Sequence, residues 1–179
     1  MLHILSFLLP RLALLSHIAF VIIVLLVITR SSWRGRIINF FGKNAILFAF
    51  LLSLAAVSSS LFYSELIGYE PCVLCWWQRI GLYPLLLIFS MALWKKNHSA
   101  FLYAVPLASF AALLAVYHSY VYMGGTSILP CTALGGACAK IYVMEFGYIT
   151  IPSMSLTIAV YVLSLAWAHK KYAEKNRHS

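Results

Sequence analysis

Charged side chains are scarce in this sequence. Only 9% of its 179 residues are Asp, Glu, Lys or Arg, and 63% are hydrophobic, whereas a soluble domain averages about 25% charged residues. So few charges cannot cover a water-soluble core, and the mean hydropathy of +0.91 agrees with this conclusion. The composition therefore excludes a soluble globular domain and indicates an integral membrane protein.

Acidic residues are especially few: four Asp and Glu stand against 13 Lys and Arg, which gives a net charge of +9. An excess of positive charge can favour nucleic acid, but here the basic residues form short clusters between apolar runs. Such clusters are typical of membrane topology signals, not of a phosphate-binding face. We therefore expect membrane lipid around the chain and no nucleic-acid partner.

Long polar segments are also absent, and five apolar runs approach the length of about 20 residues that a membrane-spanning helix needs. The longest loop covers residues 121–148. The third run is short unless Trp76 and Trp77 belong to it, and residues 1–10 either lie in the interface or extend the first helix beyond a kink at Pro10. The sequence thus predicts an all-α integral membrane protein with spans near residues 12–28, 45–62, 80–94, 100–120 and 151–168.

The basic clusters orient these spans. If five helices alternate, ten of the 13 Lys and Arg residues fall on one side, and three of the four acids fall on the other. Because positive charge marks cytoplasmic loops, we expect the amino terminus outside and the carboxyl terminus in the cytoplasm. The first run has no basic region before it and no small-residue cleavage site, so we expect a retained span and not a signal peptide.

Cysteine occurs at four positions, Cys72, Cys75, Cys131 and Cys138, and the predicted topology places all four outside the cytoplasm and outside the spans. Two pairs on the oxidising side indicate disulfide chemistry. A bridge between Cys72 and Cys75 would close a very small ring, which adds little stability, and strained, exposed disulfides are the labile ones. The Cys72–Cys75 pair is therefore predicted to be catalytic.

The Cys131–Cys138 pair fits either a structural or an exchangeable disulfide, and Gly135 and Gly136 between its members favour a mobile segment. The six residues between its cysteines exceed the roughly two to four that are typical of zinc sites. Covalent haem attachment would require His after Cys75, where Trp76 stands, and a thioredoxin-like domain would require βαβ sequence. We predict no metal site.

Arg79 is the one basic residue near the first pair, four positions after Cys75. On a helix this spacing brings both side chains to one face, and Pro71 suits the first turn of such a helix. A positive helix end and a guanidinium both favour thiolate over thiol. The alternative is an arginine whose head merely reaches the outer interface, but charge just inside that boundary is unfavourable. The pattern favours binding of a membrane quinone, whose oxygens accept hydrogen bonds.

His118 ends the fourth span on the same side. It is either a half-exposed interfacial histidine or a residue that contacts the quinone or carries a proton. Trp76 and Trp77 are expected to anchor their helix at the interface, and residues 58–60, three serines, to act as small packing residues. Among these residues His118 is the candidate for the site.

Four elements of the sequence together resemble the disulfide-bond-formation protein B (DsbB) family. They are PCVLCWWQRIGLYP at residues 71–84, Tyr117–His118, the Cys131–Cys138 loop pair, and ITIPSMSL at residues 149–156. The resemblance covers residues 45–168, and the Cys-x-x-Cys-x-x-x-Arg element is its most specific part.

The resemblance implies a four-helix transmembrane bundle at residues 45–169. Residues 1–44 would add one N-terminal transmembrane helix and a basic cytoplasmic loop, and residues 170–179 a basic cytoplasmic tail. It also implies a quinone-dependent protein disulfide oxidoreductase in the plasma (inner) membrane of a prokaryote. Such an enzyme reoxidises an extracytoplasmic thioredoxin-like (DsbA-like) dithiol oxidase and passes electrons to ubiquinone or menaquinone, which supports disulfide bond formation in exported proteins.

The family roles transfer by position. Cys72 and Cys75 match the quinone-proximal pair, with Cys75 as the thiolate that meets the quinone. Arg79 matches the arginine that supports quinone binding. Cys131 and Cys138 match the loop pair, with Cys131 as the site of the mixed disulfide with the partner.

Two features depart from the family pattern: the loop pair is tightly spaced, as in a short-loop branch, and the first span is additional. The vitamin K epoxide reductase family performs similar chemistry, but its members place the loop pair before the Cys-x-x-Cys, the reverse of the order here. A non-enzymatic membrane protein with structural loop disulfides is the other alternative.

Overall fold

The computed structural model describes residues 2–97, 99–126, 138 and 140–177. Every regular element in these ranges is a helix, and five helical segments are long and apolar enough to cross a membrane. They are α1 (Leu2–Thr29), α3 (Ala45–Leu61) continued by a π-helical segment η1 (Phe62–Leu66), α4 (Val73–Lys95), α5 (Ala100–Tyr122) and α6 (Ile151–Arg177). The predicted all-α membrane fold is confirmed, and each predicted span lies within one of these segments.

The ends of the helices refine the sequence interpretation. Trp76 and Trp77 belong to α4, which begins at Val73 and so makes the third span long enough. Pro71 lies outside the helix, and Cys72 is the residue that caps it, so the expected place of Pro71 in the first turn is wrong. Residues 2–10 extend α1 with Pro10 inside the helix.

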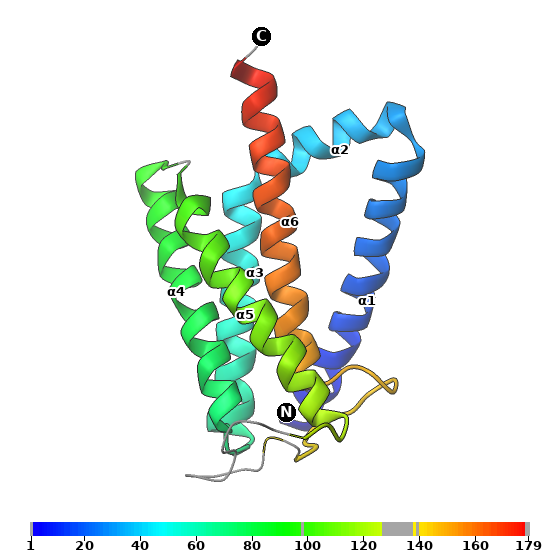
Figure 1. Cartoon of the computed structure of the whole chain (residues 1–179), viewed down its shortest axis with the longest axis vertical. Coiled ribbons are helices and arrows are strands. Elements are labelled where there is room, and N and C mark those ends of the chain that lie inside the picture. The colour runs from blue at the N-terminus through cyan, green and yellow to red at the C-terminus, as the bar shows by residue number, and fades with distance from the viewer. Residues whose placement is uncertain (1, 98, 127–137, 139, 178–179) are drawn as a thin grey trace.

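The basic segment between the first two spans is a helix, α2 (Ser31–Lys43), where a loop was expected. In Figure 1 α2 runs across the ends of α1 and α3 and meets α6. Gly42 permits this contact, because a Cβ atom there would lie 2.5 Å from the Cβ of Tyr172 and 2.7 Å from the carbonyl oxygen of Ala168. The contact links the N-terminal segment to the bundle at the end opposite the cysteines.

Helices α3 to α6 pack as a bundle, and α5 contributes a stripe of small side chains to its centre. Ala104, Ala108 and Ala111 on α5 are fully buried. Small residues let membrane helices approach closely, and Gly81 on α4 faces this stripe, because a Cβ there would lie 2.9 Å from the Cβ of Ala111. Larger side chains, among them Phe89, complete the core.

The described cysteines lie at one end of the bundle. The start of α1, the connection before α4 and residues 140–150 before α6 meet at that end, whereas α2 and the carboxyl end of α6 lie at the other (Figure 1). The hydroxyl of Tyr122 accepts hydrogen bonds from the backbone N–H groups of Tyr142 and Val143 and donates to the carbonyl of Val143. The rings of Tyr69 and Tyr142 stack 4.6 Å apart. These contacts hold the two connections against each other beside the start of α4.

Candidate functional site

Two thiols occupy the amino-terminal end of α4. Cys72 caps the helix and Cys75 lies in its first turn, and their Sγ atoms are 3.4 Å apart as free thiols. The side chain of Cys72 is buried, and its place at the helix terminus puts it near the positive end of the helix dipole. The structure therefore brings the predicted first pair together at a position that favours thiolate.

A buried histidine faces this pair from α5. His118 is only 2% exposed, so the interpretation of a half-exposed interfacial histidine is wrong. Its Nε2 atom lies 3.6 Å from the Sγ of Cys72, and its Nδ1 atom lies 3.0 Å from the side-chain nitrogen of Gln78. Because the Gln78 amide donates to Nδ1, the ring proton is on Nε2 and faces the sulfur of Cys72.

This arrangement stabilises the anionic form of Cys72, which precedes the membrane-spanning part of α4. The neighbouring Cys75 thiol, and after it His118, hold the pKa of Cys72 well below that of an ordinary cysteine, although burial opposes them. Cys72 is thus poised as a nucleophile or as a leaving group in thiol–disulfide exchange. The role of Cys75 as the thiolate that meets a quinone stays a prediction.

Arg79 points from α4 toward α3. Its Nε donates to the Oγ of Ser60 at 3.0 Å and its Nη2 donates to the Ser60 carbonyl at 3.2 Å, and the hydroxyl of Tyr83 also donates to Ser60 at 3.1 Å. The guanidinium carbon lies 5.0 Å from the ring centre of Trp76, within cation–π distance. The half-buried guanidinium is therefore held against α3, and Ser60 does more than provide packing space.

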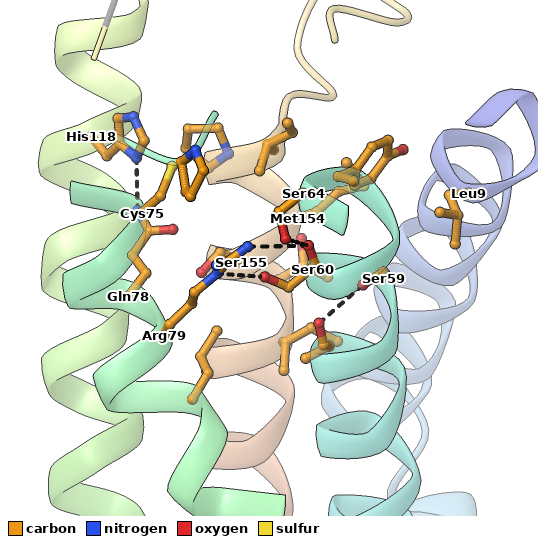
Figure 2. A pocket seen from close by; sticks show the side chains of 18 of the residues that line it. Leu9, Ser59, Ser60, Ser64, Cys75, Gln78, Arg79, His118, Met154 and Ser155 are labelled. Atoms are coloured by element: carbon orange, nitrogen blue, oxygen red, sulfur yellow. Dashed lines mark hydrogen bonds between the residues drawn. The ribbon is translucent and has the colours of Figure 1, made fainter. Parts of the chain in front are cut away.

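The thiols and Arg79 open onto one cavity of about 330 Å³ between α1, α3, α4 and α6. In Figure 2 the side chains of Cys75, Gln78 and Arg79 lie on one side of it, and Ser59, Ser60 and Ser64 come from the facing helix. Two further lining groups, the hydroxyls of Tyr63 and Ser155, are buried and have no hydrogen-bond partner among the described residues. A buried polar group without a partner is unfavourable, so these hydroxyls indicate a place for a ligand with acceptor oxygens.

The second cysteine pair is represented by Cys138, because Cys131 lies outside the described residues. Cys138 is disulfide-bonded and only 2% exposed. It shares an apolar cluster with Cys72, Leu74 and Val121, and Cys75 packs against that cluster. The three described cysteines thus meet at one place, as a relay between two disulfides requires.

A metal could also use part of this site. One ligand atom each from Cys72, Cys75 and His118 lies within 4.8 Å of the others, a spacing that suits a soft divalent metal bound by a reduced dithiol. The expected absence of a metal stays a prediction.

The sequence analysis did not assign several polar residues to the site, and it gave Ser60 only a packing role. They lie within helical segments long and apolar enough to span a membrane, where polar side chains are functional candidates by default, and this signal could have identified them. The residues are Ser60, Tyr63, Gln78, Tyr83 and Ser155.

The fold and the site define a class of protein: a multi-helix membrane protein that carries adjacent thiols at a helix end, beside a disulfide-bonded cysteine and an apolar cavity. Residues 42–169 match the family described as disulfide bond formation protein DsbB. This match covers more than half of the chain, and the chain belongs to that family. Helix α1 and nearly all of α2 lie outside the matched residues.

Relatives of known name agree with this membership. The chain is 41% identical over 113 residues to the SPbeta prophage-derived disulfide bond formation protein B of Bacillus subtilis (strain 168), which covers 63% of this chain and 76% of that protein. It is 36% identical over 115 residues to a probable disulfide formation protein of Metapseudomonas resinovorans, with 63% and 80% covered. It is 30% identical over 135 residues to the probable disulfide formation protein C 2 of Bacillus anthracis, with 75% and 96% covered. No solved structure matches the chain.

Proposed function

We propose that the chain is a quinone-dependent protein disulfide oxidoreductase of the membrane. It reoxidises an extracytoplasmic thioredoxin-like dithiol oxidase, passes the electrons to the quinone pool and so supports disulfide bond formation in exported proteins. Membership of the DsbB family supports the disulfide chemistry, and so do the names of its relatives. The clustering of basic residues supports an amino terminus outside and a cytoplasmic carboxyl terminus.

The observation that carries the proposal is the shared cavity. Cys72 and Cys75 line it together with Arg79 and Tyr83, and Cys138 lines it too. A dithiol, a guanidinium and a disulfide-bonded cysteine around one apolar space suit transfer of electrons from thiols to an apolar acceptor. Disulfides with a purely structural role would need no such cavity.

The lining of the cavity fits a quinone. Arg79 and the unpartnered hydroxyls of Tyr63 and Ser155 are donors for carbonyl oxygens, and apolar side chains such as Leu52, Leu82 and Ile158 surround the remaining space. When bound, a ubiquinone or menaquinone supplies an acceptor for two electrons and two protons. Arg79 would bind and orient one oxygen, and the apolar walls would exclude water from the ring.

The residues of the chain account for the thiol steps. A thiolate of the partner attacks Cys131 of the Cys131–Cys138 disulfide, which forms a mixed disulfide and releases the Cys138 thiolate. The second partner thiol then displaces Cys131. The partner has lost two electrons and two protons and carries a disulfide, and the loop pair is reduced.

Exchange with the first pair follows. The Cys138 thiolate attacks Cys72 of the Cys72–Cys75 disulfide and Cys75 leaves. Cys131 then displaces Cys72, which restores the loop disulfide and leaves the first pair reduced. Cys72 and Cys138 already share one buried cluster, so this exchange needs little movement, and the Nε2–H group of His118 stabilises the departing Cys72 thiolate.

Quinone-dependent reoxidation tests the proposal. The purified protein is reduced with dithiothreitol, the reductant is removed, and the thiols are alkylated over time with and without a soluble quinone. We expect Cys72 and Cys75 to return to a disulfide rapidly only when quinone is present.

Two variants separate the roles of the cysteine pairs. Cys75→Ser should abolish quinone reduction, whereas Cys131→Ser should keep quinone-dependent oxidation of a small dithiol and lose oxidation of the protein partner. Thiols that reoxidise at the same rate with and without quinone would favour a non-enzymatic membrane protein with structural disulfides in its loops.

A further inference from the structure

Helix α1 forms a wall of the cavity although it lies outside the residues that match the family. Leu9, Leu12, Ala13 and Ser16 line the cavity from α1, whereas the family match begins at residue 42. Figure 2 shows Leu9 on α1, across from Ser59 and Ser60. A four-helix member without this helix would leave the same side of the cavity to lipid.

Polar contacts fix α1 at this wall. The Nε2 atom of His17 lies 2.7 Å from the Oγ1 of Thr157, and its Nδ1 atom lies 3.2 Å from the hydroxyl of Tyr148. Because the Thr157 hydroxyl donates to the Ser153 carbonyl, it accepts from Nε2–H, and Tyr148 donates to Nδ1. One neutral tautomer of His17 thus satisfies both bonds.

A second contact lies one helical turn away. The hydroxyl of Tyr161 lies 3.2 Å from the Oγ of Ser16, and the rings of Tyr161 and Phe20 are 4.7 Å apart. Hydrogen bonds between helices support association in a membrane, where apolar burial alone does not distinguish a neighbouring helix from lipid. The contacts to α6 and to Tyr148 therefore hold this end of α1 next to the bundle.

The lining of the cavity combines polar and apolar side chains. Arg79 and Tyr83 bond to Ser60 between α3 and α4, and α1 contributes three apolar side chains, Leu9, Leu12 and Ala13, beside Ser16. A membrane quinone likewise combines a ring with oxygens and a long apolar chain. We propose that α1 supplies a binding subsite for the apolar chain of the ligand, an inference that rests on the proposed function for the identity of the ring.

This subsite makes affinity depend on chain length. Burial of one methylene group changes affinity by about fourfold, so a prenyl chain that contacts α1 strengthens binding over the same ring with a short chain. The substitution Ala13→Phe fills the subsite and should weaken binding of a prenylated quinone by about tenfold. Binding of the short-chain quinone should change little.

A photo-cross-link tests the placement directly. The probe is a quinone with a diazirine on its prenyl chain, and cross-linked peptides of the full-length protein are mapped by mass spectrometry. We expect labelling of residues 9–16, reduced in Ala13→Phe and retained in Leu15→Phe. Leu15 is the matched control because it lies on the same helix, is 61% exposed and does not line the cavity. Labelling confined to α4 and α5, or equal effects of the two substitutions, would overturn the subsite.

His17 provides a second test through the position of α1. His17→Ala removes both bonds of the imidazole and should reduce the difference in KM between long-chain and short-chain quinones, with kcat for the short-chain quinone retained. An unchanged difference would contradict the role of α1. The two proposals can fail separately. Labelling of α1 without any electron transfer would contradict the proposed function and leave the subsite standing. Normal electron transfer without labelling of α1 would contradict the subsite and leave the proposed function standing.

Discussion

The Nε2 atom of His118 on α5 lies 3.6 Å from the Sγ of Cys72 at the start of α4. Gln78 holds the opposite ring nitrogen at 3.0 Å, so the orientation of the imidazole is fixed by α4 itself. The first cysteine of the pair therefore has a hydrogen-bonding partner of its own, while Arg79, on the same helix as Cys75, bonds to Ser60. The Cys72 thiol and the Arg79 guanidinium thus have different polar partners around one cavity.

The first prediction concerns the pH dependence of Cys72. Its pKa is lowered in the folded protein by the Cys75 thiol and then by His118, so the thiolate persists as the pH falls below the ordinary range of thiols and disappears only when the lowered pKa is passed. His118→Phe removes part of this stabilisation and so raises the pKa of Cys72. As the pH is lowered, alkylation of Cys72 should therefore slow at a higher pH in this variant than in the wild type. Each unit of upward shift reduces the thiolate fraction below the pKa about tenfold.

Iodoacetamide labelling across pH, followed by peptide mapping, measures this effect in the reduced protein. His118→Gln keeps an N–H donor and should restore part of the profile. His169→Phe is the control, because His169 contacts the carbonyl oxygen of Gly42 on α2, at the opposite end of the bundle from Cys72 and Cys75. Superimposable profiles for wild type and His118→Phe would show that His118 does not stabilise the thiolate.

The second prediction concerns packing in the bundle. In Gly81→Ala the new Cβ would lie 2.9 Å from the Cβ of Ala111 and 3.2 Å from the carbonyl oxygen of Leu107, so α4 and α5 must separate. We expect a loss of about 1–3 kcal/mol in the free energy of unfolding, measured by thermal denaturation in detergent. Gly35→Ala is the control, since its Cβ would meet nothing within 4 Å. Equal stability of the two variants would contradict the tight contact.

The spans could be predicted from the sequence because they depend on composition along the chain, which hydropathy reports directly. The four cysteines could also be singled out from the sequence, because they are few and lie beside apolar runs. The helical state of α2 was missed, because its helix is completed by packing of Gly42 on α6, a contact with residues far away in sequence.

Burial of His118 and the role of Ser60 were also beyond the sequence. His118 is 46 residues from Cys72 and Ser60 is 19 residues from Arg79, so neither partner follows from helical spacing. The position of Arg79 on the same helix as Cys75 could be predicted, because four residues correspond to about one helical turn. The direction of its guanidinium could not, since it depends on the acceptors that α3 offers.

The third prediction concerns Arg79. Arg79→Ala should weaken quinone binding by about tenfold or more, because hydrogen bonds to charged groups are the strong ones, while Cys72 and Cys75 still form a disulfide. Arg79→Lys should recover part of the affinity, and Ser60→Ala should have a smaller effect, since it removes one acceptor that orients the guanidinium. Titration of the protein with a soluble quinone, with the thiols counted in parallel, makes the comparison. Unchanged affinity in Arg79→Ala would remove this residue from the site.

The last prediction uses the cluster that Cys72 and Cys138 share. The double variant that carries Cys75→Ser and Cys131→Ser leaves Cys72 and Cys138 without their usual partners. Because Cys72 and Cys138 are buried in one cluster, they should form a disulfide with each other. The matched variant Cys72→Ser, Cys131→Ser leaves Cys75 with Cys138 and should cross-link less, since Cys75 only borders that cluster. Mass spectrometry of the non-reduced protein distinguishes the two products. A Cys75–Cys138 bond that forms as readily as Cys72–Cys138 would reverse the order of exchange proposed above and make Cys75 the entry point for electrons from the loop.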